Sequence, residues 1–85
     1  MSDQTEINPL QQIAADAFQH VPNMYANGFI NGIGASDMYV VFQLNGQSSL
    51  VLNMTPALAK SLAHSLNEMI VTYETQTQQT IQAMS

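Results

Sequence analysis

The fold of this chain follows from residues 37–56, which read DMYVVFQLNGQSSLVLNMTP. Two apolar runs flank Asn45-Gly46, and Asn-Gly between such runs is the strongest short-range signal for a β-hairpin with a two-residue turn. Thr55-Pro56 then supplies a helix N-cap and a proline at the first helical position. The stretch therefore predicts a strand, a tight turn, a second strand and the start of a helix.

The two-residue turn predicts the register of the hairpin, because it places Leu44 opposite Gln47. One face, which we expect to be the core face, then carries Tyr39, Val41, Leu50, Leu52 and Met54. The other face carries Met38, Val40, Phe42 and Val51, together with Ser49 and Asn53. This second face is also too apolar for free solvent, and a contiguous exposed apolar patch usually marks an interaction site.

A long amphipathic helix is predicted to follow the hairpin, over residues 56–78. Its apolar side chains recur every three or four residues and form one wide stripe. The stripe comprises Leu58, Ala59, Leu62, Leu66, Met69, Ile70 and Tyr73. Lys60, His64 and Glu68 lie one turn apart on the opposite face, where residues four apart give a helix modest support. This position favours a solvated helix face over a catalytic role for His64.

Upstream of the hairpin, a short helix is predicted over residues 9–20. Asn8 is placed to cap it, Pro9 takes the first helical position, and Gln11 completes a capping box. Residues 24–35 favour a strand, although their three glycines suggest a bulge or the close approach of another backbone.

Together these segments predict an α+β fold. Strands over 24–35, 37–44 and 48–54 form a three-stranded antiparallel sheet, preceded by the short helix and followed by the long one. Residues 1–7 are expected to form a flexible arm, and residues 8–85 a single domain. A chain of 85 residues can hardly cover both hairpin faces by itself, so we expect an oligomer or a partner. The alternative is that the helix over 9–20 covers the second face.

The composition argues against several classes of protein. There is no cysteine, which excludes disulfides, thiolate metal sites and cysteine nucleophiles. Lys60 is the only Lys or Arg and the net charge is -5, so nucleic acids and anionic membrane surfaces are unsuitable partners. The N-terminal residues lack signal-peptide features, and no apolar run approaches ~20 residues. We therefore expect a cytoplasmic protein without a membrane span.

No arrangement of side chains predicts catalysis. His20 and His64 do not follow a zinc-binding spacing, and the six carboxylates are scattered along the chain. The glycines do not form a phosphate-binding loop, since they do not precede a helix. The sequence therefore predicts no enzymatic activity, no cofactor and no metal.

An ordered set of short motifs runs from residue 25 to residue 74. These are Tyr25-Ala26-Asn27, Ser36-Asp37-Met38-Tyr39-Val40-Val41-Phe42, Met54-Thr55-Pro56, Ala59-Lys60 and Tyr73-Glu74. They resemble the pattern of a family of small bacterial and phage proteins labelled as a domain of unknown function. That pattern has Tyr-Ala-Asn, a Ser-x-x-Asp-Phe-type strand, a Thr/Ser-Pro-x-x-Ala-Lys helix start and a closing Tyr-Glu.

The resemblance implies three antiparallel strands followed by a long helix. It also implies oligomerisation, with a strand topology similar to that of SecB-like export chaperones. The family often has an arginine in the third strand near Val51, which this chain lacks, so an anion contact from that arginine is not expected. The resemblance brings no catalytic residues, and a fold does not determine a function.

The favoured functional interpretation is a non-enzymatic homodimer or higher oligomer that engages a protein. A phage-type inhibitor of a host enzyme and a SecB-like binder of unfolded polypeptide are two forms of it. The expected interface comprises Met38, Val40, Phe42, Val51, Leu62, Leu66, Met69 and Tyr73. We expect Phe42→Asp to break assembly.

The alternative interpretation is a small-ligand binder that sequesters a nucleotide signal. Its pocket would form at the oligomer interface and be lined by Tyr39, Asn53 and Lys60. The single cation argues against it, because phosphate recognition favours several Arg or Lys side chains.

Overall fold

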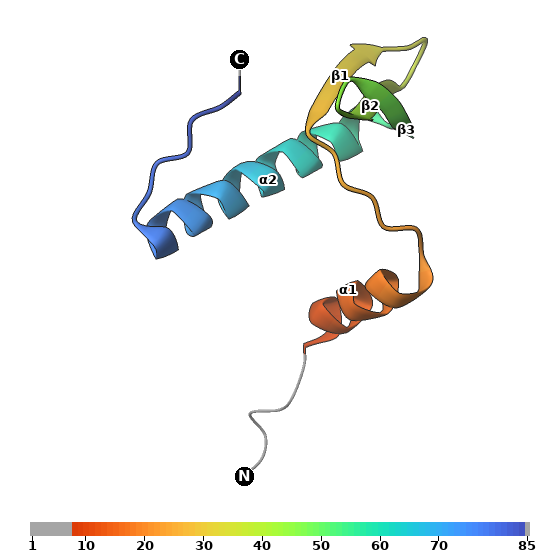
Figure 1. Cartoon of the computed structure of the whole chain (residues 1–85). Coiled ribbons are helices and arrows are strands. Elements are labelled where there is room, and N and C mark those ends of the chain that lie inside the picture. The colour runs from red at the N-terminus through yellow and green to blue at the C-terminus, as the bar shows by residue number, and fades with distance from the viewer. Residues whose placement is uncertain (1–7, 85) are drawn as a thin grey trace.

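The computed structural model describes residues 8–84 and has the predicted α+β fold (Figure 1). The elements follow in the order α1 (Pro9–His20), β1 (Gly28–Ile33), β2 (Met38–Leu44), β3 (Gln47–Met54) and α2 (Pro56–Thr77). The strands form one antiparallel sheet in the order β1-β2-β3. The flexible arm expected over 1–7 lies outside the described residues.

Both helices begin with the predicted caps. Asn8 Oδ1 accepts a hydrogen bond from the Gln11 backbone N–H at 2.9 Å, and Gln11 Oε1 accepts one from the Asn8 N–H at 3.4 Å. These two bonds form the capping box of α1. Thr55 Oγ1 accepts from the Leu58 N–H at 3.1 Å and caps α2. Each cap satisfies an N–H group that has no partner inside its helix.

The end of α2 lies one residue before the predicted one. Gln78 adopts the left-handed conformation, with φ of 57°, so the helix cannot continue through it. The backbone N–H groups of Gln78 and Gln79 both bond to the Glu74 carbonyl oxygen. They satisfy a carbonyl group that the helix itself leaves unpaired.

The hairpin turn has the predicted two residues. Asn45 and Gly46 both have positive φ, 52° and 84°, as a turn that matches the twist of a hairpin requires. Leu44 lies opposite Gln47, so the register next to the turn is confirmed.

Beyond these first pairs the predicted assignment of hairpin faces is wrong. Gln43 pairs with Ser48, but Phe42 pairs with Leu50, so Ser49 is an extra residue in a β-bulge. The Ser49 hydroxyl donates a hydrogen bond to the Phe42 carbonyl oxygen at 3.3 Å. Because side chains alternate between faces, one extra residue moves the rest of β3 to the opposite face relative to β2.

The register therefore defines two faces of the sheet. One face lies on the side of residues 24–26, which belong to the linker between α1 and β1, and we call it the linker face. It carries Phe29, Ile33, Met38, Val40, Phe42, Leu50, Leu52 and Met54. The other, which we call the open face, carries Ile30, Gly32, Tyr39, Val41, Val51 and Asn53. Val51 and Asn53 thus lie with Tyr39, not with Phe42 as predicted.

Strand β1 is shorter than the predicted strand over 24–35. The backbone N–H of Asn27 bonds to the Gln43 carbonyl oxygen at 3.0 Å. The Asn27 side chain also accepts from the Asn45 N–H at 2.9 Å and donates to Asn45 Oδ1 at 3.0 Å. These bonds hold Asn27 beside the turn. Residues 21–27, between α1 and β1, form the segment that we call the linker. At the other end, the Gly34 N–H bonds to the Asp37 carbonyl oxygen at 2.7 Å and begins the turn into β2.

Gly32 has a different role from the bulge or backbone approach that its sequence suggested. It lies directly opposite Tyr39, and the register of β1 with β2 is continuous. A Cβ built on Gly32 would lie 2.6 Å from Cζ of the Tyr39 ring. The glycine therefore leaves room for the Tyr39 ring to lie across the neighbouring strand, which is how an aromatic residue compensates for a strand glycine.

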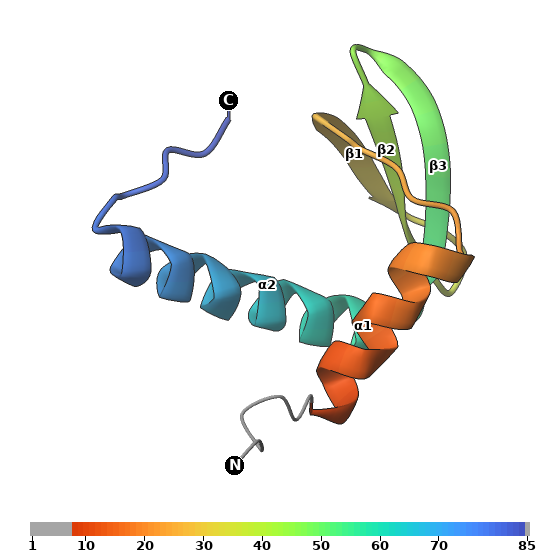
Figure 2. The same cartoon turned by 60° about the horizontal axis from the view of Figure 1, so that its bottom comes forward.

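The chain forms almost no core of its own. Among residues 8–84, Met54 is the one buried side chain. The radius of gyration is 16.2 Å, whereas a compact domain of this length has about 12 Å. Figures 1 and 2 show the reason, because α2 runs away from one end of the sheet and α1 projects from the linker. Within the described part of the chain, contacts between elements other than paired strands are weak.

Candidate interaction surface

The stripe of α2 carries the four helix residues predicted for an interface. Leu62, Leu66, Met69 and Tyr73 are between 41% and 62% exposed. A helix of 22 residues is about 33 Å long, and most of its length lies beyond the sheet (Figure 2). The structure therefore places a continuous apolar stripe on a helix that its own chain does not cover.

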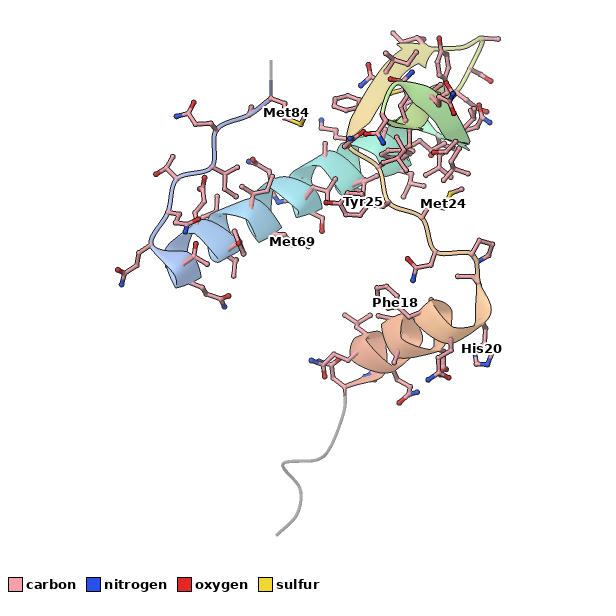
Figure 3. All side chains as sticks on the ribbon, viewed as in Figure 1. Phe18, His20, Met24, Tyr25, Met69 and Met84 are labelled. Atoms are coloured by element: carbon pink, nitrogen blue, oxygen red, sulfur yellow. The ribbon has the colours of Figure 1, made fainter. Side chains whose placement is uncertain are left out.

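The linker face is partly covered, but not by α1 as the alternative interpretation proposed. Met24, Tyr25 and Ala26 of the linker line a shallow hollow of about 200 Å³ together with Phe42, Ser49 and Leu50 of the sheet. Figure 3 shows Met24 and Tyr25 on the linker, with Phe18 and His20 on α1, further from the sheet. The cover thus comes from an extended segment and leaves Phe29 and Ile33 exposed.

Helix α1 also has an uncovered apolar side. Leu10, Ile13 and Phe18 are between 65% and 76% exposed. Their helical spacing was visible in the sequence, but the predicted interface did not include them, and the alternative interpretation used this helix only as a cover for the sheet. Phe29, Ile30 and Ile33 of β1 were also left out, because the glycines among them weakened the strand signal.

The exposed area of the chain is unusually large. Its accessible surface is 7532 Å², whereas a compact monomer of 9.3 kDa exposes about 5,000 Å². The excess is as much as about 2,500 Å² per chain. Obligate homodimers bury roughly 2,000–5,000 Å² in total, so the excess is of the size that a second chain would cover.

The eight predicted interface residues do not form one surface. Met38, Val40 and Phe42 lie on the linker face, where they are half-buried by their own chain. Val51 lies on the open face, and the other four lie on α2. The structure thus divides the eight residues among the linker face, the open face and the α2 stripe.

The three residues predicted to line a ligand pocket are only partly brought together. Tyr39 and Asn53 are direct cross-strand partners on the open face. Lys60 lies in the second turn of α2. The hollows beside α1 and beside the linker are lined by other side chains.

The polar groups of the described residues make few charged contacts. His64 Nε2 lies 3.3 Å from Glu68 Oε2, and both side chains are about 70% exposed, at 73% and 70%. An exposed pair of this kind adds little stability. Within residues 8–84, no three His, Asp or Glu side chains gather in a way that could hold a metal ion. No helix in that range has the length and apolarity needed to cross a membrane.

The sequence and the structure were compared with family models, curated proteins and solved structures. None of the three comparisons found a match to this chain.

Proposed function

We propose that the chain is a non-enzymatic protein-interaction module that works as a homo-oligomer. The observation that carries this proposal is that Met54 is the one buried side chain among the described residues, although 46% of the residues in the sequence are hydrophobic. A stable small domain needs more buried apolar surface than this, because chain entropy otherwise outweighs the gain from burial. A second copy supplies the missing surface without any disulfide or metal.

The free edge of the sheet supports a role in binding extended polypeptide. Strand β3 is an edge strand of eight residues, Gln47–Met54, without proline or charge. Edge strands of this kind are normally protected by charges or proline, because their unpaired N–H and C=O groups pair with other chains. An extended polypeptide that added itself to β3 would gain backbone hydrogen bonds and apolar contacts with the open face.

The first prediction concerns mass in solution. Light scattering on the purified full chain is expected to give at least twice the 9.3 kDa of one chain at micromolar concentration. The physical reason is that the stripe of α2 and the apolar side of α1 lose their contact with water only on association. A constant monomer mass up to millimolar concentration would contradict the proposed function.

The second prediction concerns the partner. A fluorescent, permanently unfolded lactalbumin, with its disulfides reduced and its thiols blocked, is expected to show raised anisotropy on titration with the oligomer. Native lactalbumin, the matched control, is expected to show none, because its backbone groups and apolar side chains are already paired and buried within its own fold. Equal binding of both forms, or of neither, would remove the polypeptide-binding role and leave the oligomer without an assigned partner.

A further inference from the structure

Helix α1 is held away from the rest of its own chain. Val21, at the end of the helix, is extended, with φ of -121° and ψ of 160°, and the proline that follows has a fixed φ. The hydrogen bonds of Asn27 with Gln43 and Asn45 fasten the other end of the linker. Met24 to Ala26 lie along the linker face. Residues 21–23 join α1 to the part of the linker that lies beside the sheet, and three residues span at most about 10 Å.

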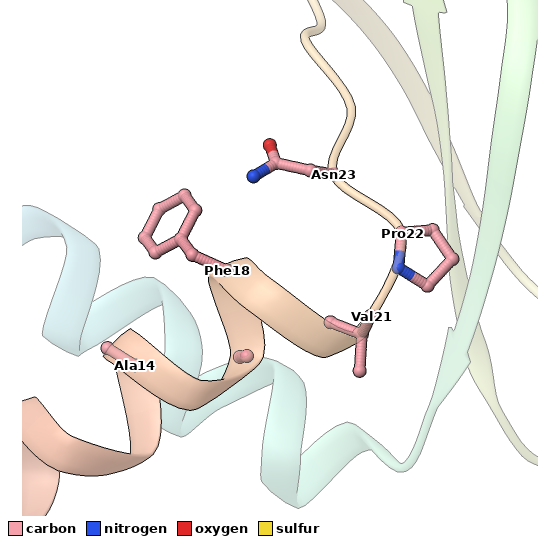
Figure 4. Close-up of a pocket in the computed structure, with 6 residues that line it drawn as sticks. Ala14, Phe18, Val21, Pro22 and Asn23 are labelled. Atoms are coloured by element: carbon pink, nitrogen blue, oxygen red, sulfur yellow. The ribbon is translucent and has the colours of Figure 1, made fainter.

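The apolar side of α1 contains a hollow. It is lined by Ala14, Ala17, Phe18, Val21, Pro22 and Asn23, and its volume is about 260 Å³ (Figure 4). Two alanines supply little side-chain bulk, whereas Phe18 and the Val21-Pro22 pair stand higher around them. A hollow with small residues flanked by larger ones accepts a large side chain from a facing helix, as ridges fit grooves in helix packing.

The outer half of α2 offers side chains of the required kind. Met69 and Tyr73 are 62% and 52% exposed and belong to the stripe defined above. Figure 3 shows Phe18 on α1 and Met69 on α2. Helix α2 begins two residues after Met54, the last residue of β3, so its first turn lies next to the sheet. Its outer half points away from the linker that carries α1 (Figures 1 and 2).

We propose that α1 of one chain packs on the α2 stripe of a second copy, and that the second copy returns the same contact. This inference rests on the proposed homo-oligomer and names the surface that forms it. A reciprocal exchange covers both unpaired helices with one kind of contact and closes the assembly as a two-fold dimer. It also covers part of the excess surface, since the contact between α1 and α2 is made twice in each dimer.

A second copy fits better than the chain's own α2. Contacts between α1 and α2 of one chain are at most weak, and the stripe extends about 22 Å from Leu58 to Tyr73, away from the linker. The two surfaces are also alike in charge, because neither the α1 side nor the α2 stripe contains a Lys, Arg, Asp or Glu. A contact between them buries no unpaired charge.

Disulfide cross-linking tests the exchange, because the chain has no cysteine of its own. Ala17→Cys and Met69→Cys chains are unfolded together, refolded together and oxidised, and the mixed product is identified by its mass. The control pair is Gln19→Cys with Met69→Cys, since Gln19 lies on the side of α1 opposite Ala17. A disulfide needs Cβ atoms within ~4.5 Å, so we expect roughly tenfold more mixed product from the first pair.

Several outcomes would overturn this inference. Equal yields from the two pairs would show that α1 presents no particular face to α2. A chain that carries both Ala17→Cys and Met69→Cys can also be oxidised at low concentration. A disulfide formed within that one chain would place α1 on its own α2. If wild-type chains are oligomeric but the yields are equal, only the proposed packing of α1 on the partner's α2 fails. If wild-type chains are monomeric, the proposed function fails with it.

Discussion

Leu62→Asp is expected to convert the oligomer into monomers. Leu62 belongs to the α2 stripe, in the half nearer the sheet, and is 41% exposed in the single chain. Full burial of a leucine contributes about 1.5–3 kcal/mol, of which the exposed 41% of Leu62 carries less than half, and a buried aspartate without a partner costs more. Because each copy of a two-fold dimer carries the change, the dissociation constant should rise at least about a hundredfold. Light scattering over a dilution series measures this change.

Val71→Asp is the matched control for this prediction. Val71 is an apolar α2 residue that is 54% exposed and lies nine positions after Leu62. At 3.6 residues per turn, nine residues place the two side chains on opposite sides of the helix. The control therefore adds the same charge to the same helix and should leave the mass unchanged. Dissociation of both variants would indicate general weakening of α2, and dissociation of neither would remove the stripe from the interface.

The elements that the sequence predicted well are those determined by neighbouring residues. The caps at Asn8 and Thr55 and the Asn45-Gly46 turn depend on side chains within four positions of one another. The α2 stripe depends only on helical period, so its residues were found without knowledge of any contact. These local signals were sufficient for the α+β class and for the order of the elements.

The features that the sequence missed depend on residues far apart in the chain. Nothing in QSSLVLNM distinguishes Ser49 as an extra residue, because Ser48 and Ser49 are alike and the bulge depends on pairing with β2. The start of β1 depends on Asn27 reaching Asn45, eighteen positions away. The position of α1 depends on how the linker crosses the sheet. The helical spacing of its apolar residues therefore could not show whether α1 covers the sheet or stays exposed.

The bulge has a direct experimental consequence, since it places Phe42 and Val51 on opposite faces. Phe42 lies on the central strand opposite both Phe29 and Leu50, and the linker lies against it. Phe42→Asp places a charge in the apolar cluster that the chain forms by itself, at a cost of about 3 kcal/mol. We expect the midpoint of thermal unfolding, followed by circular dichroism, to fall by more than about 10 °C. Loss of assembly would then follow from loss of the fold.

Val51→Asp is expected to behave differently. Val51 is on an edge strand and is 52% exposed on the open face, so the change should lower the free energy of unfolding by less than about 1 kcal/mol. The proposed dimer uses the helices and leaves the open face free, so this variant should keep the mass of the wild type. A dissociated but folded Val51→Asp chain would instead place the open face inside the assembly. Retained mass with weaker binding of unfolded lactalbumin would separate the surface that assembles the oligomer from the surface that meets its partner.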